Sequence, residues 1–198
     1  MGTAFYVPDS LNKAVRAGVA ALALAAIAPV RASAADCPYA NAEPDEVSVD
    51  QYSDGLLCAI NAKRREWQRN ELRLQRNLTR AAGSHAADMA TEGYFSHTSR
   101  DGDTLLDRLD QANFIPRSDR WRAGENLAAG EASLGTPAAI VSGWMNSREH
   151  RINLLDPGFT MVGLGVARGW PAAGDQNDNA MTIDIDLGWR VVGRRSSR

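Results

Sequence analysis

The sequence is poor in the residue types from which many catalytic and metal-binding sites are built. Its 198 residues include three histidines and two cysteines, and lysine occurs only at Lys13 and Lys63. The formal net charge of −2 excludes the basic field by which proteins recruit nucleic acid. There is no glycine-rich phosphate loop and no Gly-x-Ser-x-Gly nucleophile elbow. The few imidazole groups are therefore the residues of interest.

Long apolar runs are also missing, apart from a short one near the N-terminus. Residues 17–28 are apolar, follow Lys13 and Arg16, and precede the small-x-small pattern Ala32-Ser33-Ala34. This order is typical of a secretory signal peptide, and the run is short for a bilayer span. We predict a signal peptide over residues 1–34, a secreted, periplasmic or cell-envelope location, and no stable transmembrane anchor in the mature chain. The alternative is an uncleaved anchor.

The two cysteines, Cys37 and Cys58, both follow the predicted cleavage site. An even number of cysteines in an exported chain indicates a disulfide. The bond would tie an N-terminal lead-in, residues 35–52, to the first helix. It would close a loop of about 20 residues and contribute roughly 3 kcal/mol. Two free thiols are the alternative.

Helical periodicity dominates the first part of the mature chain. Apolar residues at helical spacing predict helices over about residues 50–67 and 77–93. For the second helix we predict Asn77 as the N-cap and Gly93 as the terminator. Capping and proline signals predict three shorter helices: one that begins after residues 103–104, one from 137 to about 147, and one from 149 to 155.

Alternation with a period of two characterises the end of the chain. Residues 160–168 and 180–189 alternate as strands, and the aspartates of the second fall on the face opposite its isoleucines. Residues 123–128 resemble the entry to a strand, with Gly130 as a breaker. Helices that precede most of the strands predict an α+β fold, with helices packed on a mostly antiparallel sheet.

The three histidines carry whatever imidazole chemistry the chain performs. His85 lies on the apolar face of the 77–93 helix, and we expect a buried structural residue with a hydrogen-bond partner. His97 and His150 lie just outside helices, and Glu125 follows a glycine. These three could hold a Zn²⁺-like ion with an open position, or act as acid and base near neutral pH. The alternative is a polar network that pins loops together.

Several motifs are similar to those of one protein family. In chain order they are Asn61, Leu78, Ala82, His85, Asp88-Met89-Ala90, Tyr94-Phe95-Ser96-His97, Asp101-Gly102, Asp107-Arg108, Gly124-Glu125-Asn126-Leu127-Ala128, Trp144-Met145-Asn146-Ser147, His150-Arg151-x-Asn153-Leu154-Leu155 and Gly163-x-Gly165. In these motifs the chain resembles the bacterial branch of the CAP superfamily, the cysteine-rich secretory, antigen 5 and pathogenesis-related 1 proteins, also called SCP domains. The resemblance implies a CAP/SCP domain over residues 53–189, followed by a basic tail over residues 190–198. It also implies a three-layer α-β-α sandwich.

The resemblance further implies a surface cleft, the CAP cavity, lined by two histidines and two acidic residues. By motif these are His97, Glu125 and His150, and Ser147 stands where the second acid is expected. Family members have been linked to lipid, sterol and divalent-metal binding. We therefore expect a secreted binding module for a small apolar ligand, such as a lipid, or for a cell-envelope component. The alternative is a metal-dependent hydrolase in the same cavity, protease-like or other, with Zn²⁺ or Mg²⁺ on His97, His150 and Glu125.

Overall fold

A four-stranded sheet forms the centre of the domain. The computed structural model describes residues 37–116, 120–171 and 177–191. Within them the strand order is β1 (Arg73–Leu74), β3 (Met161–Arg168), β4 (Ala180–Arg190) and β2 (Trp121–Glu131). The pairs β3–β4 and β4–β2 are antiparallel, and the short β1 runs parallel to β3. The prediction of a mostly antiparallel sheet is confirmed.

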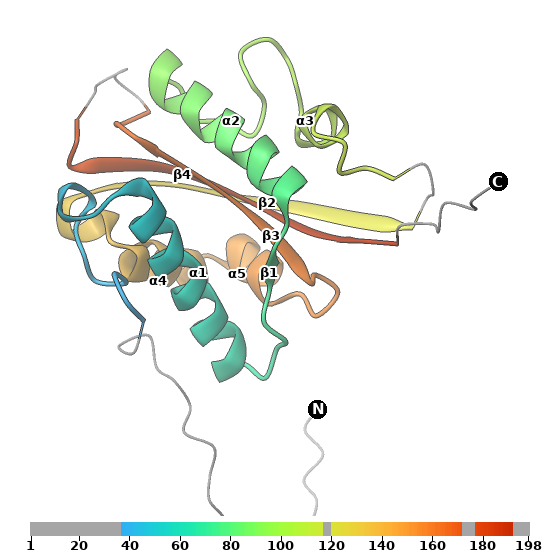
Figure 1. Cartoon of the computed structure of the whole chain (residues 1–198), viewed down its shortest axis with the longest axis horizontal. Coiled ribbons are helices and arrows are strands. Elements are labelled where there is room, and N and C mark those ends of the chain that lie inside the picture. The colour runs from blue at the N-terminus through green and yellow to red at the C-terminus, as the bar shows by residue number, and fades with distance from the viewer. Residues whose placement is uncertain (1–36, 117–119, 172–176, 192–198) are drawn as a thin grey trace, which may run out of the picture. The chain divides into compact units, whose positions relative to one another are not determined.

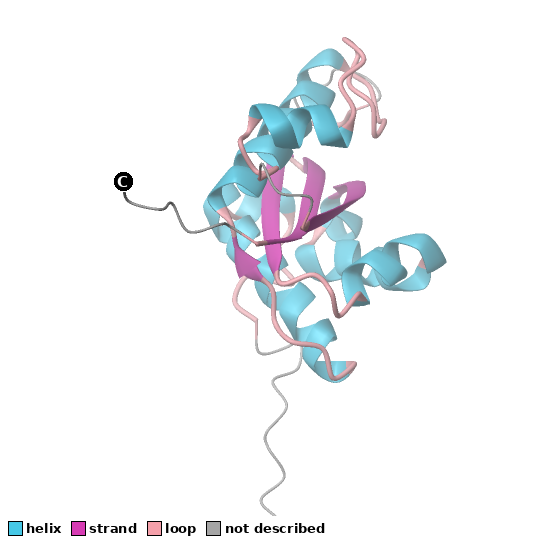
Figure 2. Cartoon of the chain, turned by 90° about the vertical axis from the view of Figure 1, so that its right-hand side faces the viewer, coloured by secondary structure: helices cyan, strands magenta, loops and turns pink. Residues whose placement is uncertain are grey.

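Helices cover both faces of this sheet (Figures 1 and 2). One face carries α2 (Arg76–Glu92) and α3 (Leu105–Gln111). The other carries α1 (Val49–Glu66), α4 (Pro137–Asn146) and α5 (Arg148–Leu155), and two short 3-10 turns, η2 (Pro44–Glu46) and η3 (Ala132–Gly135), complete the domain. The three-layer α-β-α sandwich is confirmed. Among the described helices none is long and apolar enough to cross a membrane.

The main apolar core lies between the sheet and α1, α4 and α5. Alternating residues of β4, Ile183 and Ile185, are fully buried there against Leu56 of α1, Trp144 of α4 and Leu154 of α5. Burial of such side chains stabilises a fold by about 1.5–3 kcal/mol each. The indole N–H of Trp144 donates to the Leu127 carbonyl at 2.9 Å, so this residue also ties α4 to β2 at the edge of the sheet.

The opposite face of the sheet is covered closely by α2. A Cβ placed on Gly165 would lie 2.1 Å from the Ala82 carbonyl oxygen, and one on Gly163 would lie 2.1 Å from the Leu78 carbonyl carbon. Only residues without a side chain allow this approach of helix and strand. As a result the polar face of β4, including Asp184 and Asp186, is buried.

Most predicted helix ends agree with the structure, with two corrections near the sheet. Gly93 ends α2 in the left-handed region at φ 66°. Asn77 is not the N-cap of α2, because the Gln75 side chain accepts from the backbone N–H groups of Asn77 and Leu78. Gly130 does not break β2, which continues to Glu131. Its role is close packing, since a Cβ there would lie 2.6 Å from the Leu134 carbonyl oxygen.

The N-terminal lead-in is tied to α1 by the predicted disulfide. Cys37 and Cys58 are bonded, with their Cα atoms 5.6 Å apart. Helix α1 begins at Val49, inside the 35–52 segment, and Ser48 caps it by accepting from the Gln51 N–H. The predicted signal peptide over 1–34 and the tail beyond residue 191 lie outside the described residues.

Candidate functional site

His97 and Glu125, 28 residues apart in sequence, are in direct contact. The left-handed turn at Gly93 releases the chain from α2 into the segment that carries His97, while Glu125 lies in β2. His97 Nδ1 is hydrogen-bonded to Glu125 Oε2. The His97 side chain is 61% exposed and that of Glu125 is 4% exposed, so the pair joins the surface to the interior.

Arg108 of α3 holds the other oxygen of the same carboxylate. Its Nη2 donates to Glu125 Oε1 at 2.5 Å. Nη1 and Nη2 also donate to the His97 carbonyl, at 3.3 and 3.2 Å. A further bond joins Nη1 to the Asp103 carbonyl at 3.0 Å. Arg108 therefore positions both members of the His97–Glu125 pair. Sequence reasoning gave it no role, because nothing local to α3 indicates a partner in β2.

His150 lies in the first turn of α5 and is held by the residue that precedes the helix. Its Nδ1 lies 2.8 Å from Ser147 Oγ. Burial lowers the pKa of His150 below its ordinary value, and the neighbouring His97 lowers it further, whereas Glu149 opposes the shift. The two predicted imidazoles are thus close enough to interact electrostatically, although they belong to different layers of the fold.

The backbone beneath these residues is joined by asparagine amides. Asn153 of α5 donates to the Glu125 carbonyl at 3.1 Å, and Asn126 of β2 donates to the His150 carbonyl at 3.0 Å. The two amides also bond to each other, from Asn153 Nδ2 to Asn126 Oδ1 at 3.1 Å. This clasp ties α5 to β2 and holds the backbone of His150 close to that of Asn126. The sequence motifs contained both asparagines but did not reveal that they join α5 to β2.

The structure does not bring the three predicted metal ligands together as a set. Among the described residues, a different set of possible metal ligands lies close together. It consists of His85, Glu125 and Asp184, whose ligand atoms lie within 4.8 Å of one another. Neither His97 nor His150 belongs to it. The fourth position of the cavity motif, Ser147, offers a hydroxyl in place of a carboxylate and is bonded to His150. The arrangement therefore does not fit a metal ion held jointly by His97, Glu125 and His150.

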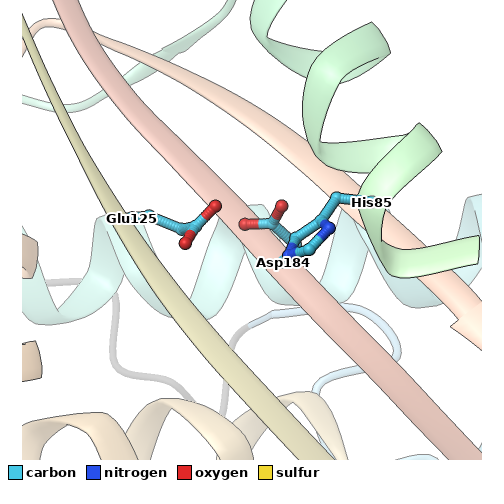
Figure 3. Close-up of side chains that lie close together, drawn as sticks. All are labelled: His85, Glu125 and Asp184. Atoms are coloured by element: carbon cyan, nitrogen blue, oxygen red, sulfur yellow. The ribbon is translucent and has the colours of Figure 1, made fainter. Parts of the chain in front are cut away.

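His85 is buried, as the sequence predicts. Its Nε2 donates to the Ser96 carbonyl at 2.9 Å, and its Nδ1 lies 3.3 Å from Ser99 Oγ. Burial, and next the charge of Arg108, lower the pKa of His85, so it is kept neutral; Glu125 has the opposite effect. Figure 3 shows the imidazole beside the carboxylate of Asp184, with Glu125 on the neighbouring strand.

Asp184 and Asp186 on β4 were not predicted as site residues. Burial raises the pKa of both carboxyl groups well above the ordinary value of 3.8. The neighbouring charges of Asp186 and Glu125 raise the pKa of Asp184 further. The charge of Glu125 also raises the pKa of Asp186. The strand register places Asp186 directly opposite Glu125. Their alternation with isoleucine was visible in the sequence, but the alternation alone does not distinguish a solvent-facing aspartate from one that is covered by a helix.

An α-β-α sandwich with a histidine–glutamate pair and a second histidine at the start of a short helix defines a CAP-type domain. The comparison with known families agrees: the model of the cysteine-rich secretory protein family, CAP, matches residues 57–175. The chain belongs to this family.

Relatives of the chain are bacterial and longer than it is. The uncharacterized protein YkwD of Bacillus subtilis is 32% identical over 118 residues, which cover 60% of this chain and 43% of YkwD. The uncharacterized membrane protein YlbC of the same organism is 40% identical over 87 residues, 44% of this chain and 23% of YlbC. The chain therefore spans less than half the length of these curated relatives.

Two solved structures share the fold. An extracellular protein containing a SCP domain from Bacillus anthracis has a TM-score of 0.55 and 26% identity; the match covers 71% of this chain and 43% of that chain. An outer surface protein of Borrelia burgdorferi has a TM-score of 0.59 and 19% identity, over 73% of this chain and 97% of that chain. The second likeness concerns the fold alone.

Proposed function

We propose that the chain is an exported binding module that recognises a small apolar ligand or a cell-envelope component through the surface of His97, Glu125, Ser147 and His150. The observation that carries this proposal is the complete engagement of Glu125. Arg108 and His97 each occupy one of its oxygens. A carboxylate so bound positions its partners and is not free to act as a general base or to activate water.

The two imidazoles suit recognition because their orientations are set before a ligand arrives. Glu125 holds His97 through Nδ1, and Ser147 holds His150 through Nδ1. Each ring can then present its other nitrogen to a ligand. Groups ordered in advance lose little entropy on binding, which favours affinity.

Apolar side chains accompany both histidines in the sequence. Phe95, two residues before His97, is 49% exposed, and Ile152, two residues after His150, is 53% exposed. Exposed large apolar residues near polar anchors support a ligand with both an apolar part and a polar head. A lipid of the cell envelope has that composition. Export is supported by the predicted signal peptide and by the relative that is described as extracellular.

A binding experiment tests this proposal directly. The mature chain is sedimented with lipid vesicles and, separately, with purified cell-wall sacculi, alongside the variants His97→Ala and His150→Ala. We expect one of the two targets to retain the wild-type chain, and each variant to bind at least about ten-fold more weakly. Lys63→Ala, at the surface end of α1, serves as the control and should bind as the wild type does.

Two results would contradict the proposal. The first is the absence of binding to either target. The second is steady conversion of an envelope fraction into products by the wild type and its loss in His150→Ala, since that is the behaviour of a hydrolase. No contact described above favours the hydrolase, so we keep it only as an outcome of this experiment.

A further inference from the structure

The interface between α2 and the sheet encloses a second constellation, distinct from the exposed histidines. We define the buried cluster as His85 of α2, Glu125 of β2 and Asp184 of β4. One ligand atom from each lies within 4.8 Å of the other two, and all three residues are buried. In Figure 3 the carboxylates of Glu125 and Asp184 point toward each other across the strands, with the His85 ring next to Asp184.

The carboxylates of Asp184 and its neighbour Asp186 have no partner among the described residues. Both residues are completely buried, and none of their four side-chain oxygens accepts a hydrogen bond there. Buried polar groups are nearly always hydrogen-bonded, and an ionised carboxylate without a partner is far more costly than a neutral group. Glu125 already accepts from Arg108 and contacts His97, but each of its oxygens has a second lone pair that an ion could use.

A divalent cation would neutralise the ionised form of the cluster. Glu125, Asp184 and Asp186 carry three negative charges when ionised, and Arg108 supplies one positive charge. A cation of charge two brings the sum to zero, and it gives the Asp184 oxygens the partner that the protein does not provide.

We propose that the buried cluster of His85, Glu125 and Asp184 is a binding site for a divalent transition-metal ion, with Asp186 as the adjacent carboxylate. An imidazole nitrogen with carboxylate oxygens is a ligand set typical of Zn²⁺ and is also suited to Mn²⁺, whereas Mg²⁺ prefers oxygen alone. Metal-bound histidines are usually oriented by a backbone carbonyl or a carboxylate, and His85 contacts the Ser96 carbonyl at 2.9 Å.

The ion would hold the layers together, and it would share only Glu125 with the proposed binding surface. Its three ligands come from α2, β2 and β4, so binding would tie the helix to two strands. Glu125 Oε2 contacts His97, whose side chain is 61% exposed, so one ligand of the cluster lies next to a surface residue. The metal site can be tested separately from the proposed function, because His85 and Asp184 have no part in the proposed binding surface.

Equilibrium dialysis of the EDTA-treated, folded chain against Zn²⁺, and in a second arm against Mn²⁺, tests the site. We expect one ion per chain and a rise in the thermal unfolding midpoint with ion concentration. Asp184→Asn should weaken binding by at least about ten-fold. We expect this variant to fold, because the amide has the shape of the carboxyl group and carries no charge. His85→Gln is the second variant and should weaken binding similarly.

Asp156→Asn provides the matched control, since it makes the same chemical change in an acid that pairs with Arg122 outside the cluster. It should bind the ion as the wild type does. Three results would overturn the inference: no uptake of either ion at millimolar concentration, unchanged uptake by both Asp184→Asn and His85→Gln, or loss of uptake in His150→Ala. The last would place the ion at the exposed histidines.

Discussion

Arg108 and Glu125 form an ion pair in the interior, with 2.5 Å between Nη2 and Oε1 and with side chains that are only 6% and 4% exposed. The pair links α3 to β2 and is the means by which a surface histidine is held in place. Because the carboxylate has a cation on one side and an imidazole on the other, its position is determined by two separate segments of the chain. The stability of the fold and the position of His97 in the proposed binding surface therefore depend on the same contact.

Removal of the cation should be costly. We expect Arg108→Met to reduce the free energy of unfolding by about 3–5 kcal/mol, because it leaves a buried carboxylate without its charge partner. Urea denaturation of the two proteins measures the difference. Arg122→Met breaks the ion pair with Asp156, in which the arginine is 52% exposed, and should cost about 1 kcal/mol or less. Equal losses in the two variants would show that burial of the Arg108 pair is not what matters.

The contact between α2 and β3 should not tolerate a methyl group. Gly165→Ala would place a Cβ 2.1 Å from the Ala82 carbonyl oxygen, so we expect a loss of about 3 kcal/mol or more as the helix is pushed off the sheet. Gly83→Ala is the control in the helix itself. A Cβ there meets nothing within 4 Å, and the helix should gain about 0.5–1 kcal/mol. Thermal and urea unfolding would reveal opposite signs; a stable Gly165→Ala protein would refute the close packing.

The disulfide should contribute to stability through the unfolded chain. It closes a loop with a sequence separation of 21, so we expect the Cys37→Ser/Cys58→Ser double variant to lose about 3 kcal/mol. Denaturation with and without a reducing agent provides the measurement. Reductant should lower the stability of the wild type toward that of the variant and leave the variant unchanged. A wild type that is indifferent to reduction would argue against this contribution.

His150 should make the fold sensitive to mild acid. Its folded pKa is lower than the ordinary value of 6.5, chiefly by burial and next by His97, so the unfolded chain binds the proton more readily. The stability it contributes is complete above pH 6.5 and is lost as the pH falls toward its folded pKa. The His150→Gln variant should therefore lose less stability between about pH 7 and pH 5 than the wild type does. The difference should stay below about 1 kcal/mol, since the ring is partly solvated.

Urea denaturation at several pH values would measure this effect. The difference between the two proteins isolates His150, because His85 and the buried aspartates titrate in both. If the variant lost more stability than the wild type as the pH falls, the direction of the pKa shift would be wrong.

Local interactions explain why many elements could be predicted from the sequence. Gly93 adopts the left-handed conformation that ends α2, Thr104 caps α3 by accepting from the Asp107 N–H, and Pro137 begins α4. Each of these depends on residues within a few positions in the chain. The N-cap of α2 was missed because a glutamine, which is a less common cap than asparagine, provides the hydrogen bonds.

Part of the candidate site could also be predicted. The motifs placed His97, Glu125, Ser147 and His150 together, and the structure joins them as two contacting pairs, His97 with Glu125 and Ser147 with His150. Local sequence did not reveal Arg108, because its partner Glu125 lies on a different element, 17 residues away.

The sequence by itself determined the alternation of β4, the cysteine pair, the ends of most helices and the family. Only the tertiary structure decided that the polar face of β4 lies in the interior. That outcome follows from Gly163 and Gly165 on the neighbouring strand, which let α2 approach and cover Asp184 and Asp186. Alternation specifies which residues share a face, but packing of a distant helix decides whether that face meets water. For this protein that packing gathers the buried carboxyl groups of Glu125 and Asp184 beside His85.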